Sequence, residues 1–223
     1  MTIKPFHFNL KKISSKEQSL LEAIWEFLPA TGLRDSFEDK VKDTLKNLLS
    51  EDVSLNLSSI HEEIYSSFLA KLPKNSVMAV VGLAPLQHKA VLEIDSPLAA
   101  LVIEKILGGE AKRLPEPKVL SETEQGILQY ILAELFYSIH KLSGKDERVH
   151  FRFDRFAFAP HEIRDLAESN ARVSTLVFRV IIGQHSGFLR LVLPDPFVEA
   201  GFLNIKDAAE MKESESRWIA KRF

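Results

Sequence analysis

Residues 89–142 carry the sequence KAVLEIDSPLAALVIEKILGGEAKRLPEPKVLSETEQGILQYILAELFYSIHKL, which decides the fold of this chain. The stretch begins with a strand-like segment over 89–94 that is rich in Val, Leu and Ile. Pro97 then suits the first turn of a helix, where a missing backbone N–H costs nothing. The sequence therefore predicts a strand that leads directly into an apolar helix over 98–107.

The second half of this stretch predicts a longer helix. Gly108 follows the last apolar residue of the first helix, and a left-handed glycine commonly ends helices in this way. A Pro-rich polar loop comes next, and Ser121 with Glu124 three residues later forms a capping-box signature. We expect this second helix to span 122–142 and to end at Ser143-Gly144.

The chain beyond the second helix is β-rich. Residues 149–158 alternate polar and apolar side chains and then shift register at Arg155-Phe156. Residues 173–182 and 187–193 predict a hairpin that turns at 183–186.

The end of this hairpin also repeats the pattern of residues 91–107. Its second strand leads through Pro194-Asp195-Pro196 into an apolar segment, as residues 91–94 lead through Asp95-Ser96-Pro97 into a helix. The repetition of strand, acidic-proline turn and helix predicts a two-fold pseudo-repeat within 77–205.

The first 75 residues are more polar and predict a helix-rich region. Three-to-four spacing of apolar residues predicts helices over 20–28 and 37–49, the second opened by the capping signal Asp35-Ser36. Alternation over 53–60 predicts a short half-buried strand, and apolar spacing predicts a further helix over 61–72.

A boundary is expected at Pro73-Lys74-Asn75-Ser76, which is polar and turn-forming. The chain would then consist of an N-terminal region over 1–75, a main domain over 76–205, and a charged linker or helical tail over 206–223. The expected core of the main domain is apolar at helix and strand spacing: Val91, Leu92, Ile94, Leu98, Leu101, Val102, Ile106, Leu128, Ile131, Leu135, Val177, Leu191 and Leu193.

Composition excludes several classes of function. With 29 basic and 31 acidic residues, the net charge of -2 gives no concentrated basic surface for nucleic acid or an anionic membrane. The absence of cysteine excludes disulfides, thiolate metal sites and cysteine nucleophiles. The N-terminus has no apolar core of signal-peptide length, and the longest apolar run, 77–86, falls short of the ~20 residues that span a bilayer. We expect a soluble, cytoplasmic protein.

No catalytic, cofactor or metal constellation is predicted. His61 and His161 each begin an HExxH match, but Tyr65 and Asp165 occupy the second ligand position. A metal site in which His150 meets His161 or His185 across strands is the alternative, and scattered histidines more often serve ordinary surface or core roles. Ser96 is expected to cap a helix and Ser186 to lie in a hairpin, since neither is in a G-x-S-x-G elbow.

Three segments together resemble the CheC–FliM superfamily, and in particular the C-ring or sorting-platform proteins of type III secretion (SctQ). They are Leu92 to Gly109, the helix start LSETEQGIL, and GFLRLVLPDPFVEA. The resemblance covers roughly 77–205 and implies an α/β domain of the α+β type, with long helices on a largely antiparallel sheet and internal pseudo-two-fold symmetry.

The resemblance implies a non-enzymatic scaffold without cofactors. Such a protein links the membrane base of the secretion system to the ATPase complex and assists substrate loading. Its expected partners are base or adaptor, stator and ATPase-regulator proteins, and chaperone–substrate complexes. It would be cytoplasmic and peripheral to the inner membrane, and the full-length protein would self-associate. The family adds SpoA modules at the C-terminus, and their activities are expected to be missing from this chain.

Two relatives within the superfamily provide alternatives. Flagellar switch proteins of the FliM type favour GGxG in the loop that contacts the rotor, whereas this chain has Gly108-Gly109-Glu110-Ala111 and no EIDxLL-like segment. CheC-type phosphatases need Glu and Asn at fixed distances on a helix, and the register from Ser121 places Gln125 and Leu128 there. These departures favour the secretion branch.

The loop after the first helix is the predicted protein-binding site. By the resemblance, its start meets a neighbouring ring component, and loops on a rigid scaffold commonly carry binding residues. A solvated connector remains the alternative. The candidate residues are Gly108, Gly109, Glu110, Lys112 and Arg113.

Overall fold

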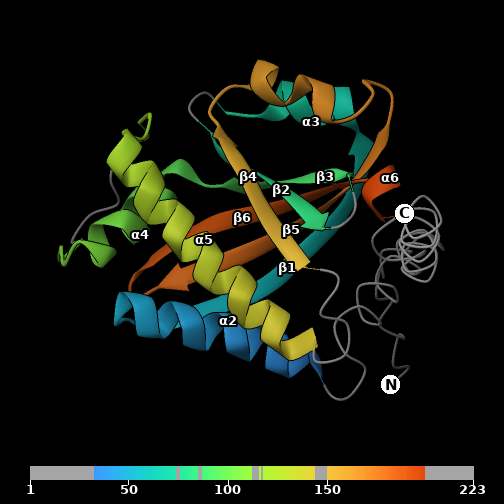
Figure 1. Ribbon diagram of the computed structural model, residues 1–223. Helices are drawn as coiled ribbons and strands as arrows, with labels where there is room; N and C mark the ends of the chain where they lie inside the picture. The colour runs from blue at the N-terminus through green and yellow to red at the C-terminus, as the bar shows by residue number, and fades with distance from the viewer. Residues whose placement is uncertain are drawn as a thin grey trace, which may run out of the picture.

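The computed structural model describes residues 33–73, 76–84, 87–111, 116, 118–143 and 150–198. Six antiparallel strands form one sheet in the order β1-β5-β6-β3-β2-β4 (Figure 1). The mixed fold predicted from the sequence is confirmed. The elements are α2 (Leu33–Leu49), β1 (Val53–Ile64), α3 (Tyr65–Lys71), β2 (Val77–Ala84), β3 (Lys89–Ile94), α4 (Ser96–Ile106), α5 (Glu122–Ser143), β4 (His150–Ala157), the 3-10 helix η1 (Pro160–Leu166), β5 (Arg172–Ile182), β6 (His185–Pro194) and α6 (Asp195–Val198).

The order of elements repeats once along the chain. The series α2, β1, α3, β2, β3, α4 is followed by α5, β4, η1, β5, β6, α6. The hairpins β2–β3 and β5–β6 meet at the centre of the sheet through β3 and β6. The first strand of each half crosses to the other half, so that β1 pairs with β5 and β4 pairs with β2. The predicted pseudo-two-fold is confirmed, and its first unit begins at α2 rather than at residue 77.

Strand β1 precedes the predicted boundary at residue 75 but pairs with β5, which follows it. Segment 53–64 forms β1 and belongs to the same sheet as the strands between 77 and 194. Helix α2 packs beside α5, where Thr44 Oγ1 lies 3.0 Å from Ser138 Oγ. Residues on both sides of the predicted boundary therefore share one core. The predictions for 20–28 and for the tail 206–223 lie outside the described residues.

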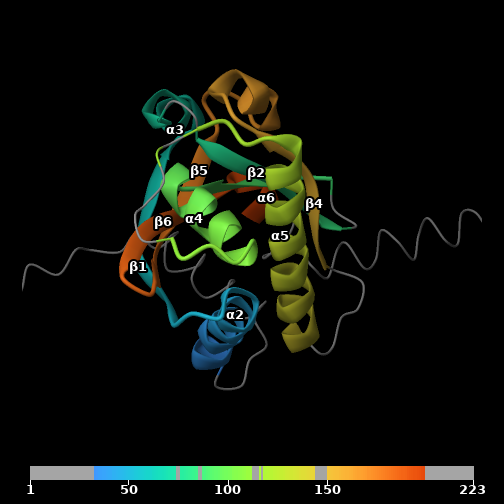
Figure 2. The same cartoon turned by 90° about the vertical axis from the view of Figure 1, so that its left-hand side faces the viewer.

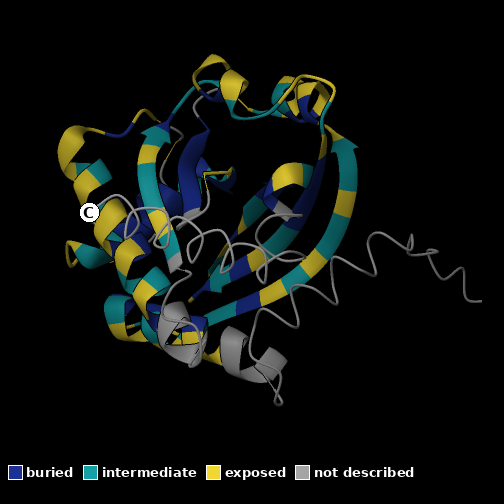
Figure 3. Cartoon of the chain, turned by 45° about the vertical axis from the view of Figure 1, so that its right-hand side comes forward, coloured by how far each residue is buried: buried dark blue, intermediate teal, exposed yellow. Residues whose placement is uncertain are grey.

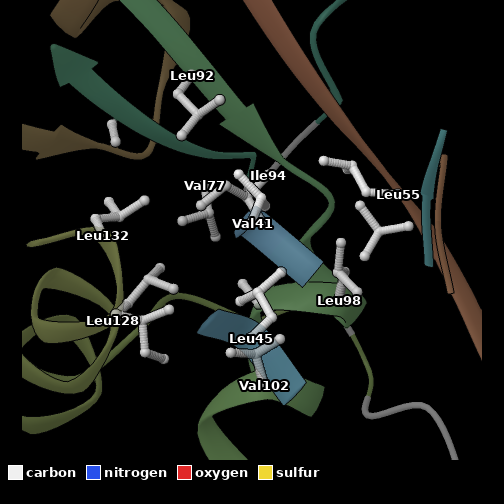
Figure 4. Close-up of a cluster of buried hydrophobic side chains, with 14 of the residues drawn as sticks. Val41, Leu45, Leu55, Val77, Leu92, Ile94, Leu98, Val102, Leu128 and Leu132 are labelled. Carbon is white, nitrogen blue, oxygen red and sulfur yellow. The ribbon is translucent and has the colours of Figure 1, made fainter. Parts of the chain in front are cut away.

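Different helices pack against the two faces of the sheet. Helices α2, α4 and α5 lie on one face, while α3 and η1 cover part of the other (Figure 2). Buried residues concentrate in the interior strands β2 and β3, and exposed residues lie along the outer surfaces of the helices (Figure 3). The larger apolar cluster lies between the three helices and the sheet, as Figure 4 shows for side chains such as Val41, Leu98 and Leu128.

Most of the predicted core residues are buried. Leu101 is completely inaccessible, whereas Val91 lies in the smaller cluster under α3 and η1. The predicted core residues that are only half-buried are Ile106, Leu135, Val177 and Leu191.

Two local predictions differ from the structure. Residues 61–64 continue β1 instead of opening a helix, because they pair with 172–175 of β5, and α3 begins only at Tyr65. Asp95 rather than Ser96 occupies the N-cap of α4. Among the described residues, the buried Ser96 Oγ has no hydrogen-bond partner.

The register shift predicted in β4 is present as a bulge at Asp154. Val80 pairs with Arg155 and the next residue, Val81, pairs with Phe153, so Asp154 has no opposite residue. An extra residue in one strand reverses the alternation beyond it. This reversal lets Phe153 and Phe156 both pack against the larger core cluster, with ring centroids 4.7 Å apart.

The predicted capping box starts α5. Ser121 Oγ and the Ser121 N–H each donate to Glu124 Oε2 at 2.9 Å. Lys118 Nζ lies 2.6 Å from the other carboxylate oxygen of Glu124. The hydrogen bonds from Lys118 and Ser121 lower the pKa of Glu124 to about 2.

Replacing Glu124 with Gln is expected to remove a pH-dependent part of the stability. Gln keeps a capping oxygen but has no carboxylate. Because the pKa of Glu124 is depressed from 4.5 to about 2 on folding, its carboxylate stabilises the protein above the unfolded pKa, and this contribution disappears as the pH falls through that interval. Urea denaturation between pH 2 and pH 7 should show the wild-type advantage shrinking towards the acid end.

The exposed Glu122→Gln variant in the same helical turn is the control for the Glu124 experiment. A stability difference between wild type and Glu124→Gln that stays constant across this pH range would contradict the proposed role of the carboxylate.

Candidate protein-binding site

The predicted binding loop begins with a well-formed helix terminus at the end of α4. Gly108 has a φ of 83°, as its position predicted, and its N–H donates to Lys105 O at 3.0 Å. The Gly109 N–H donates to Glu104 O at 2.9 Å. This pair of hydrogen bonds is the Schellman motif, which satisfies carbonyl groups in the last helical turn.

Gly109 is required by a close approach rather than by its φ. A Cβ there would lie 2.5 Å from Glu104 Cγ and 3.0 Å from Glu104 O. Only glycine therefore leaves room for the Glu104 side chain to fold back along the loop.

Ala111 closes the described part of the loop in an unusual conformation. Its φ is 48°, in the left-handed region that favours glycine. The third position at which flagellar switch proteins favour glycine thus holds an alanine with a glycine-like backbone. The side chain of Ala111 is buried at 3% exposure, which packs its methyl group into the core.

Two neighbouring turns lie against the base of the loop. Lys105 Nζ forms an ion pair with Glu51 Oε1 at 2.5 Å, which ties the end of α4 to the turn before β1. The Gly183 N–H donates to Asp52 O at 2.9 Å, which joins that turn to the β5–β6 hairpin. Three segments far apart in sequence therefore meet at one end of the sheet.

Leu107 is an apolar side chain that the start of this loop exposes, although its spacing in the sequence predicts a place in the helix body. Val119, near the other end of the loop, is 60% exposed. Leu107 is 67% exposed, and Gly108 and Glu110 beside it are also exposed. Its place at the C-cap, directly before a left-handed glycine, was the signal that could have indicated its exposure. Lys112 and Arg113 lie outside the described residues.

The structure does not bring together the histidines of the alternative metal site. His150 in β4 and His185 in β6 belong to strands separated by β3 and β2, and His161 lies in η1. In the described ranges, no group of three or more His, Cys, Asp or Glu residues could hold a metal ion.

The residues in the register of the phosphatase signature have structural roles. Gln125 Nε2 donates to Leu120 O at 3.0 Å. Leu128, at 3% exposure, belongs to the core and cannot face a substrate.

Comparison with known proteins identifies the family. The family model for the flagellar motor switch protein FliM matches residues 29–205. This chain belongs to the FliM family. The superfamily resemblance drawn from the sequence is thereby confirmed, and the FliM match begins well before residue 76.

Individual FliM relatives are distant in sequence. FliM of Borreliella burgdorferi is 19% identical over 193 residues, which are 86% of this chain and 52% of that protein. The chain spans about half the length of the curated FliM proteins it matches first.

Solved structures share the FliM-family fold. A chain in the crystal structure of the FliG–FliM complex from H. pylori has a TM-score of 0.67 at 19% identity, with coverage of 79% of this chain and 93% of that chain. A chain in the FliM–SpeE complex from H. pylori has a TM-score of 0.65 at 17% identity, covering 87% and 100% respectively. Among the described residues, none of the helices is long and apolar enough to cross a membrane.

Proposed function

We propose that this chain is a scaffold subunit in the cytoplasmic ring of a flagellar motor, where it contributes to the switch. The family match over residues 29–205 carries this proposal. The sequence alone favours the secretion branch, partly because Ala111 stands where flagellar switch proteins favour a glycine. The left-handed φ of Ala111 weakens that argument, since the backbone conformation is the one that glycine would provide.

The binding contact in this proposal is the loop after α4. Gly108, Gly109 and Glu110 keep the role that the sequence suggested, and Leu107 supplies the apolar group. The Schellman motif holds the start of the loop at Gly108 and Gly109, so these residues would lose little conformational freedom on binding. A FliG-type rotor protein is the proposed partner, because a chain of similar fold is solved in a complex with FliG.

The second candidate is a sorting-platform scaffold of type III secretion, located at the inner membrane through the secretion apparatus. The sequence features that favour it are Glu110 and Ala111 in the loop and the strand GFLRLVLPDPFVEA. Co-purification with the base, stator and ATPase-regulator proteins of a secretion system, without any flagellar rotor protein, would support this candidate over the flagellar one.

Leu107→Asp is expected to weaken binding to the FliG-type protein of the same organism by about tenfold or more, since burying an unpaired carboxylate in an interface is costly. Folding should be unchanged, because Leu107 is 67% exposed. Isothermal titration calorimetry and thermal unfolding of the same samples measure both quantities.

Ile64→Asp is the matched control for the Leu107 variant. Ile64 is 48% exposed and lies at the end of β1 away from the loop. Equal affinity of wild type and Leu107→Asp for the FliG-type protein would show that this loop is not the contact.

A further inference from the structure

The left-handed conformation of Ala111 is stabilised from outside the loop. A residue with a Cβ disfavours a φ of 48°, so neighbouring groups must hold it there. Both polar backbone groups of Ala111 are engaged by side chains. The Ala111 N–H donates to Glu104 Oε1 at 3.0 Å, and His185 Nε2 lies 2.7 Å from Ala111 O.

The direction of the second hydrogen bond follows from its chemistry. A carbonyl oxygen only accepts hydrogen bonds, so His185 Nε2 must carry the hydrogen and donate it. His185 is the first residue of β6, directly after the hairpin turn at Gly183. The hairpin therefore reaches across to the loop that follows α4.

Glu104 reaches the loop because of the glycine pair. Its carboxylate can lie next to Ala111 only when residue 109 has no side chain, since a Cβ there would come within 2.5 Å of Glu104 Cγ. Glu104, Gly109 and Ala111 thus form one interdependent unit at the helix end.

We propose that Glu104 and His185 are positioning residues that together hold the Ala111 peptide group and so fix the orientation in which the loop presents Leu107. This inference rests on the proposed function of the loop as the partner contact. The β5–β6 hairpin thereby becomes part of the binding site although its side chains need not touch the partner. The hairpin is itself anchored, because Gly183 N–H donates to Asp52 O.

The test compares variants that remove each hydrogen bond with variants that keep it. His185→Ala removes the donor, whereas His185→Gln retains an N–H donor of similar reach. Glu104→Ala removes the acceptor, whereas Glu104→Gln retains an amide oxygen. His61→Ala is the control, because His61 is exposed and bonds Ser59 on β1.

Two quantities are measured on each variant. Hydrogen exchange of the Ala111 amide, measured by NMR, reports how often the Ala111 hydrogen bond opens. Calorimetry with the FliG-type rotor protein measures the binding affinity. Each alanine variant should bind about 2- to 12-fold more weakly, as expected for the loss of one hydrogen bond. Glu104→Ala should also speed Ala111 exchange, and both glutamine variants should restore wild-type affinity.

Wild-type affinity of both alanine variants would overturn the positioning role while leaving the proposed function intact. Failure of the glutamine variants to restore affinity, with all variants folded by circular dichroism, would also overturn it. If the wild-type protein does not bind the rotor protein at all, the proposed function is wrong and the positioning role falls with it.

Discussion

Replacing Leu101 with Ala should lower the free energy of unfolding by about 2–5 kcal/mol. Leu101 lies in α4 with no accessible surface, inside the cluster that α2, α4 and α5 form with the sheet. Truncation loses the transfer energy of three carbon atoms and leaves a cavity that rigid neighbours cannot fill. Urea denaturation with a two-state fit measures the loss.

Leu107, at the C-cap of the same helix, offers a matched control for Leu101. Leu107→Ala removes the same atoms from a side chain that is 67% exposed. Its effect should stay within about 0.5 kcal/mol of wild type. Similar losses for the two variants, or a loss well below 1 kcal/mol for Leu101→Ala, would mean that the core is not where the structure places it.

Gly187→Ala is expected to cost about 1–3 kcal/mol, because the added methyl group overpacks the contact between β6 and α4. A Cβ at this buried position would lie 2.9 Å from Leu98 Cβ and 3.3 Å from Asp95 Oδ2. The Cβ of Leu98 moves only with the helix backbone, so α4 must shift away from the sheet. Thermal unfolding monitored by circular dichroism should show the lower midpoint.

A second glycine provides the opposite expectation. Gly126 is exposed within α5, and a Cβ there would meet nothing within 4 Å. Gly126→Ala should therefore raise the free energy of unfolding by about 0.5–1 kcal/mol, the usual gain from replacing glycine inside a helix. If Gly126→Ala is stabilised but the thermal midpoint of Gly187→Ala equals that of wild type, then Gly187 is not closely packed against Leu98.

The sequence correctly predicted the features that depend only on residues close together in the chain. The capping box at Ser121 and the left-handed Gly108 are examples, because caps and turns depend on neighbours in sequence. The β5–β6 hairpin was also predicted, although its turn occupies only 183–184, since Ile182 pairs with His185.

The errors arose where distant partners decide the outcome. Residues 61–64 fit a helical spacing, but pairing with β5 makes them a strand. Segment 53–64 joins the same sheet as the strands after residue 76, because polar turn residues such as those at 73–76 also occur within a domain. At the candidate site, the contact between His185 and Ala111 joins residues 74 positions apart, which no periodicity can indicate.

The exchange of first strands between the two halves has a consequence for how the chain folds. During synthesis β1 emerges early, yet the strand that it pairs with, β5, follows after β4 and η1. Closing such long loops costs entropy before any pairing compensates for it, which slows folding. Neither half can complete its own sheet, so the nascent first half must wait with its strand edges open. We therefore expect the domain to become stable only after the β5–β6 hairpin has been synthesised and can pair with both β1 and β3.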